Sequence, residues 1–181
     1  MTKLINEPQL KTILELAKMA LTRDAELVPI LFFTTTKNPD QIRITPLKFD
    51  KPDHDDKAFY LALIGNDIKT KLGDIQEAVM INDAYALILA KGQKPNDADM
   101  PVRDNPARVE TIVITGRTAD GKNNGLIMQP YKRDGKNINF DEPTIEVNKK
   151  GSYSVGLLDY IFNPLLARQA ERVQTSKYGK N

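Results

Sequence analysis

A four-residue motif that occurs twice constrains the fold of this chain more than any other feature. Asp120-Gly121-Lys122-Asn123 and Asp134-Gly135-Lys136-Asn137 each lie between apolar segments rich in strand-favouring residues. Asp-Gly tolerates the positive φ angles that tight hairpin turns require. Two such turns in succession predict a β-meander in the C-terminal half, with strands over residues 107–118, 125–132 and 138–147. The first of these strands is apolar on both faces near its middle, so we expect it to be central in the sheet.

The rest of the chain alternates predicted helices and strands. Apolar residues at helical spacing predict helices over residues 8–23 and 53–72, the second ending at Gly73. Between them we expect a hairpin of strands 27–36 and 41–47 with its turn at Asn38-Pro39-Asp40, and a further strand begins at Ile75. A short helical turn over residues 156–162 precedes Asn163-Pro164, where Asn163 is expected to cap a last helix.

This order of elements predicts the α+β class. We expect a single α+β domain over residues 1–175, built on an antiparallel sheet of five or six strands with helices packed mainly on one face. Residues 176–181 are small, polar and basic, so they are expected to form a frayed tail. The proline-containing segment 91–106 is the longest predicted loop. Its polar cluster of Asn96, Asp97 and Asp99 is interpreted as part of a solvated connection, with a functional loop as the alternative.

The composition excludes several function classes. Twenty-six basic and 24 acidic residues give a net charge of +2, which provides no strong field for phosphate backbones or anionic lipid. The absence of cysteine removes thiolate nucleophiles, iron–sulfur clusters and thiolate zinc sites. The sequence has no GxxxxGK[ST], GxGxxG, GxSxG or HExxH motif, and we predict no cofactor. Without a signal-like segment or an apolar run of ~20 residues, the expected location is cytoplasmic, away from membranes.

His54 is the only histidine, and it stands among Asp53, Asp55 and Asp56. A zinc or nucleophilic site needs further ligands or an oriented base, so helix capping by the acids is the favoured interpretation. Binding of a hard cation is the alternative, although the spacing does not match a calcium loop. The methionines Met19, Met80 and Met128 are interpreted as core residues rather than as the lining of a cofactor pocket.

Two alternating pairs of polar residues provide the best local candidates for a site. Arg108 and Glu110 lie two apart on a predicted strand and therefore share a face with Ile112 and Ile114. Asp83 and Tyr85 end the preceding strand and are expected beside them. We assign Arg108 and Tyr85 to binding and Asp83 and Glu110 to catalysis if the protein is an enzyme, with no metal ligands assigned. The alternative is a solvent-facing structural ion pair.

The residues around these pairs carry a resemblance. The strand end Asp83-Ala84-Tyr85, followed by Asp104-Asn105-Pro106-Ala107-Arg108-Val109-Glu110, resembles a loose group of small uncharacterised bacterial proteins. In that group an acidic-Ala-aromatic strand end is followed by Asp-x-Pro-x-Arg-x-Glu, with glutamate and tryptophan where this chain has Asp83 and Tyr85. The resemblance implies a shared fold and a shared polar corner, and it implies no activity.

The missing catalytic motifs favour a non-catalytic binding or assembly module over an enzyme. Self-association through an exposed strand or through the second face of the sheet is the expected form of assembly. One alternative is a small divalent-cation-dependent hydrolase that uses Asp83 and Glu110, with Arg108 as the anion binder. A second alternative is a weak nucleic-acid binder that uses the basic, aromatic hairpin around Tyr131, Lys132, Arg133 and Lys136.

Overall fold

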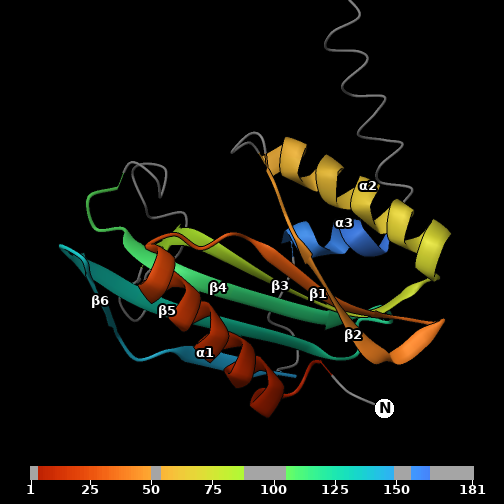
Figure 1. Cartoon of the computed structure of the whole chain (residues 1–181), viewed down its shortest axis with the longest axis horizontal. Coiled ribbons are helices and arrows are strands. Elements are labelled where there is room, and N and C mark those ends of the chain that lie inside the picture. The colour runs from red at the N-terminus through yellow and green to blue at the C-terminus, as the bar shows by residue number, and fades with distance from the viewer. Residues whose placement is uncertain (1–3, 50–53, 88–104, 149–155, 164–181) are drawn as a thin grey trace, which may run out of the picture.

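An antiparallel sheet organises the molecule in the computed structural model (Figure 1). The structure describes residues 4–49, 54–87, 105–148 and 156–163. The elements, in chain order, are α1 (Glu7–Asp24), β1 (Ile30–Thr35), β2 (Asn38–Pro46), α2 (His54–Leu72), β3 (Ile75–Ala86), β4 (Val109–Thr118), β5 (Asn124–Asp134), β6 (Asn137–Phe140), β7 (Thr144–Val147), the 3-10 turn η3 (Gly156–Leu158) and α3 (Asp159–Phe162).

The strands follow the order β2-β1-β3-β4-β5-β6, and β7 also pairs with β5. Every pairing in the sheet is antiparallel. The predicted α+β class with a C-terminal meander is therefore confirmed, and β4 is central as expected. The third meander strand, predicted as one piece, is divided into β6 and β7, which pair with opposite ends of β5. Pro143, which lacks an N–H group, lies in the break between them.

Two of the three predicted hairpin turns lie where the sequence places them. Gly121 and Gly135 have φ angles of 68° and 60°, and they reverse the chain between β4, β5 and β6 as predicted. The turn predicted at Asn38-Pro39-Asp40 is wrong, because Thr35 pairs with Asn38 and only two residues separate the strands. Pro39 is instead part of β2, which tolerates it because β2 is an edge strand.

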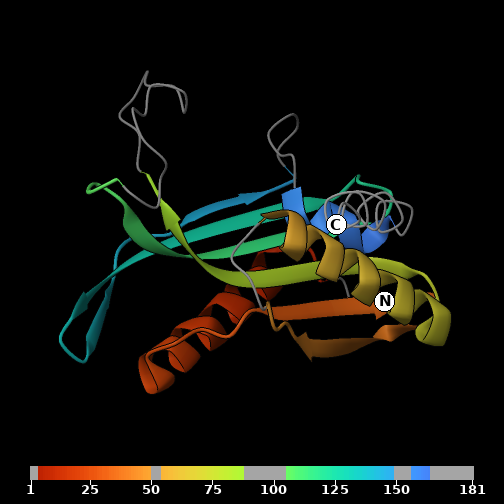
Figure 2. The ribbon, with the colours of Figure 1, turned by 90° about the horizontal axis from the view of Figure 1, so that it is seen from above.

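The sheet carries a hydrophobic cluster on each face. Alternate residues of β3 point to opposite sides: Val79 and Ile81 pack in the cluster of α1, while Ala78 and Met80 pack in the cluster of α2 and α3. Figure 2 shows α1 on one side of the sheet and α2 with α3 on the other. Two of the three described helices thus share a face, and α1 alone covers the second face.

Helix α1 begins and ends close to the predicted residues. The Asn6 side chain accepts a hydrogen bond of 2.9 Å from the Gln9 N–H, and Pro8 occupies the first turn, where no N–H is needed. The helix ends at Ala25, which has a left-handed φ of 55° and donates its N–H to the Leu21 carbonyl. Its buried stripe faces the sheet: Leu10, Ile13, Leu14, Ala17 and Leu21.

Helix α2 also follows the prediction, ending at Leu72 before Gly73, whose φ is 90°. The predicted helical turn over residues 156–162 is present as η3 and α3. The structure does not describe three other predicted segments: the capped helix expected after Asn163, the basic tail, and the polar cluster of Asn96, Asp97 and Asp99. Within the described ranges, no helix is both long enough and apolar enough to cross a membrane.

Candidate functional site

The four candidate residues of the sequence meet at one end of the sheet, on the face covered by α1. Pairing of β3 with β4 places Tyr85 opposite Glu110 and Asp83 opposite Ile112. Arg108 directly precedes β4, and its guanidinium lies 4.4 Å from the centroid of the Tyr85 ring. The structure therefore brings these side chains together across a gap of more than twenty residues in the sequence.

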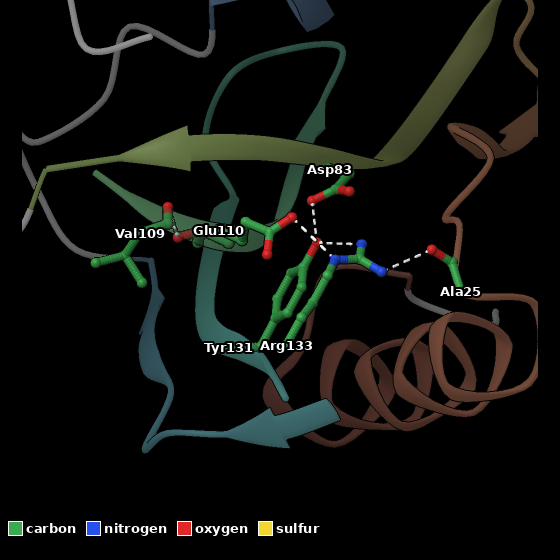
Figure 3. Close-up of polar contacts among 7 residues, drawn as sticks. Ala25, Asp83, Val109, Glu110, Tyr131 and Arg133 are labelled. Carbon is green, nitrogen blue, oxygen red and sulfur yellow. Dashed lines mark hydrogen bonds and ion pairs between the residues drawn. The ribbon is translucent and has the colours of Figure 1, made fainter. Parts of the chain in front are cut away.

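Two residues of β5 join them. Tyr131 lies opposite Glu110 on the side of β4 away from β3, and it is only 1% exposed. Its hydroxyl donates a 2.9 Å hydrogen bond to Asp83 Oδ1 and accepts one of 3.2 Å from Arg133 Nη2 (Figure 3). We call the whole set the corner cluster: Asp83, Tyr85, Arg108, Glu110, Tyr131 and Arg133.

Arg133 connects the corner cluster to helix α1. Its Nε donates to Glu110 Oε1 at 3.0 Å, and its Nη1 donates to the Ala25 carbonyl oxygen at 2.8 Å (Figure 3). Ala25 is the C-terminal cap of α1, where helix carbonyls lack internal partners and the helix dipole favours a cation. The guanidinium therefore fixes the end of α1 against β4 and β5.

The pKa values of the cluster residues are shifted by removal from water and by the neighbouring charged and hydrogen-bonding groups. Desolvation raises the pKa of Asp83; the Tyr131 hydrogen bond opposes that rise, and the charge of Glu110 adds to it. Desolvation and the neighbouring Asp83 carboxylate raise the pKa of Tyr131, so the phenol keeps its proton at neutral pH. The hydrogen bond to Glu110 raises the pKa of Arg133. The cluster thus holds a protonated phenol and a guanidinium between two carboxyl groups.

The arrangement leaves one part of the cluster available to another molecule. Tyr85 is 49% exposed, and Arg108 is exposed beside it. Among the described residues, no carboxylate pairs with Arg108, whereas Arg133 makes an ion pair with Glu110. Asp83, Glu110, Tyr131 and Arg133 are thus engaged with one another, whereas the exposed Arg108 and Tyr85 contact each other.

The structure gives limited support to a metal site. In the part of the chain that it describes, no group of three His, Cys, Asp or Glu side chains converges. Asp83 and Glu110 interact electrostatically, but Glu110 is paired with the Arg133 guanidinium, which repels a cation. The side chains of Asp53, His54 and Asp55 lie outside the described set, so the predicted capping stays a prediction.

From the sequence, Tyr131 and Arg133 are predicted only as part of a basic hairpin, and their place in the corner cluster is not foreseen. The position of the Asp120-Gly121 turn is enough to predict where Tyr131 and Arg133 lie. A hairpin reversed between Asp120 and Gly121 sets residues equally distant from the turn opposite each other, which pairs Glu110 with Tyr131. Alternation along β5 then places Arg133 on the same face. Since Arg133 is bound to Glu110, it is less available to nucleic acid than the exposed Lys132 and Lys136.

No protein-family model, curated protein or solved structure matches this chain. The resemblance to the group of small bacterial proteins therefore stays a prediction.

Proposed function

We propose that this protein is a non-catalytic binding module whose contact surface is the Arg108–Tyr85 pair, and that it receives a carboxylate from an acidic protein partner. The observation that carries the proposal is the exposed guanidinium stacked 4.4 Å from the centre of an exposed ring, with no carboxylate partner among the described residues. Arginine and tyrosine are enriched at the energetic centres of protein interfaces. Guanidinium also matches carboxylate in bidentate geometry.

The rest of the corner cluster supports binding by making this surface rigid. Tyr85 belongs to β3, which is paired along its length with β4. The Tyr131–Arg133 network holds Asp83, two residues earlier on the same face of β3. Stacking on the ring limits the conformations of Arg108 before a partner arrives, which lowers the entropy lost on binding. The raised pKa of Tyr131 favours a hydrogen-bonding role for this phenol over a role as a base.

A titration with a short polyglutamate peptide tests the proposal. Chemical shifts of the backbone amides around Tyr85 and Arg108 are expected to move in the wild type, and Arg108→Ala is expected to weaken binding about tenfold. Lys122→Ala removes the same charge from the exposed turn between β4 and β5 and serves as the matched control. Equal binding to all three proteins, or no binding to the wild type, contradicts the proposal.

A divalent-cation-dependent hydrolase is the second candidate, favoured by one observation. Asp83 and Glu110 lie on the same face of neighbouring strands and are linked through the Tyr131 hydroxyl and the Arg133 guanidinium. The charge of Glu110 also raises the pKa of Asp83. Such a site predicts that Mg²⁺, Mn²⁺ or Ca²⁺ raises the melting temperature of the wild type but not of Glu110→Gln. A null result with all three ions argues against it and leaves the binding proposal standing.

A further inference from the structure

The outward face of helix α1 is unexpectedly apolar. Leu16 and Met19 are 52% and 67% exposed, although Met19 was predicted to be a core residue. That prediction is wrong because Met19 lies opposite the stripe of Leu10, Leu14 and Leu21 that packs on the sheet. Figure 2 shows α1 outermost on its side of the sheet, with no other described helix over it.

An open groove accompanies these side chains. It has a volume of about 710 Å³ and lies between α1 and β6, with Leu16, Met19, Ala20 and Phe140 among its lining residues. Lys18 stands over the Phe140 ring at 5.4 Å and forms one wall. An apolar surface of this kind is an expected site for contact with another protein.

The two edges of the sheet are poor sites for self-association. Edge strand β2 contains Pro39 and Pro46 as well as the charged Asp40 and Arg43. At the opposite edge, β6 and β7 have four residues each and are interrupted. Prolines, charges and short edge strands all oppose strand addition, so assembly by this route is disfavoured.

The charges around Met19 specify a partner. Glu15 and Arg23 lie one helical turn before and one turn after Met19, on the same face of α1. If a second α1 packs antiparallel with Met19 against Met19, each Glu15 meets the Arg23 of the other copy. The surface is therefore complementary to itself under a two-fold axis, which is the usual symmetry of homodimers.

We propose that two copies of this chain associate through α1, antiparallel, with Leu16 and Met19 at the centre and Glu15–Arg23 pairs on both sides. Glu15 now pairs with Lys18 at 3.1 Å and Arg23 with Asp24 at 2.6 Å, and both acids and Arg23 are exposed. Exposed ion pairs contribute little to stability, so Glu15 and Arg23 can change partners on dimerisation at a small cost in free energy.

The size of the contact sets the expected affinity. With 18 residues, α1 is about 27 Å long, so two copies of this helix make a short contact. We therefore expect a reversible dimer whose population grows over micromolar protein concentrations.

A charge exchange tests this arrangement. Sedimentation equilibrium of the full chain is expected to show a mass that rises from 20.3 kDa toward twice that value with concentration. Glu15→Arg and Arg23→Glu are each expected to stay monomeric, because each places like charges together at both ends of the helix pair. A mixture of the two variants restores both attractive pairs and is expected to recover the dimer.

Matched controls lie on the other side of the sheet. Asp67 and Lys71 form an exposed ion pair on α2, so Asp67→Arg and Lys71→Glu make the same charge changes away from α1. They are expected to leave the dimer intact, as is Arg108→Ala, which separates this test from the polyglutamate test. Circular dichroism verifies that every variant is folded. A wild type that stays monomeric, single variants that still dimerise, or a mixture that fails to recover the dimer overturns the proposal.

Discussion

The two ends of strand β4 carry the same pair of chemical groups in different surroundings. Near its C-terminal end, the Arg117 guanidinium lies 5.2 Å from the centre of the Phe162 ring and forms an ion pair with Asp159 of α3. Just before its N-terminal end, Arg108 lies 4.4 Å from the Tyr85 ring, and no described acid pairs with it. Both arginines stack on an aromatic ring, but only Arg117 joins a helix to the sheet.

Stacking on an aromatic ring therefore does not by itself distinguish a structural arginine from one that binds a partner. The difference lies in the partners of the remaining N–H groups, since a guanidinium has five donors. Arg117 and Arg133 each use theirs to hold a helix end, α3 in one case and α1 in the other. Arg108 retains its donors among the described residues, and this is the reason for assigning it to binding.

The largest effect is expected where α3 meets α2. A Cβ atom on Gly65 collides with the backbone carbonyl of Ile161, which cannot move without shifting α3. Gly65→Ala is therefore expected to lower the free energy of unfolding by about 3 kcal/mol, the upper range for overpacking. Chemical denaturation measures the loss, and Asn66→Ala, an exposed change on the same helix, is the control. A loss below that of the control contradicts the close contact.

The next effect concerns the buried hydroxyl of the corner cluster. Tyr131→Phe removes the hydroxyl that joins Asp83 to Arg133, and it leaves the Asp83 carboxylate with one hydrogen-bond donor fewer. We expect a loss of about 1–2 kcal/mol at neutral pH. Tyr85→Phe is the matched control, because the Tyr85 hydroxyl has no hydrogen bond to the described residues. If Tyr131→Phe and Tyr85→Phe lose equal free energies of unfolding, the hydrogen bonds of the Tyr131 hydroxyl do not stabilise the fold.

Replacing Arg117 or Arg108 is expected to have a smaller effect on stability, and the two arginines are expected to differ. Arg117→Ala breaks a partly exposed ion pair and a stacked contact, and is expected to cost about 1 kcal/mol of stability. The free energy of unfolding of Arg108→Ala is expected to stay within about 0.5 kcal/mol of the wild type, while its polyglutamate binding weakens about tenfold. Chemical denaturation of both variants measures this difference in stability. If Arg108→Ala is as destabilising as Arg117→Ala, both pairs are structural.

The fold was largely predictable because its determinants are local. Gly121 and Gly135 mark the meander, and Asn6, Pro8 and Gly73 mark helix ends, all by short-range backbone chemistry. The first hairpin turn was misplaced because Pro39 is also acceptable in an edge strand, and being at the edge is a property of the whole sheet.

The site was predictable only in part, for a related reason. Glu110 opposite Tyr131 follows from the hairpin register, but Asp83 beside Tyr131 depends on the pairing of β3 with β4. More than twenty residues separate those strands, and no turn chemistry fixes their register. The contact of Arg133 with Ala25 depends in addition on where α1 packs.

The smallest effects on stability are expected at two aspartates, Asp83 and Asp120, whose pKa values are shifted in opposite directions. Burial raises the pKa of Asp83, whereas hydrogen bonds from the Thr118 hydroxyl and the Lys122 N–H lower the pKa of Asp120 in the turn. A raised pKa means that the folded state binds a proton more tightly than the unfolded state, so Asp83 reduces stability as pH rises above about 4. A lowered pKa has the reverse sign, and the stabilisation by Asp120 is lost as pH falls below about 4.

These signs predict opposite results for two equivalent substitutions. Asp83→Asn keeps an oxygen that accepts from Tyr131 and removes the desolvated charge, so it is expected to be more stable than the wild type at pH 7 and equal to it in acid. Asp120→Asn is expected to be less stable at pH 7, with the difference vanishing in acid. Urea denaturation across this pH range measures both differences. If Asp83→Asn is instead less stable at pH 7, the attraction of Arg133 outweighs desolvation, and the ionised carboxylate is an integral part of the corner cluster.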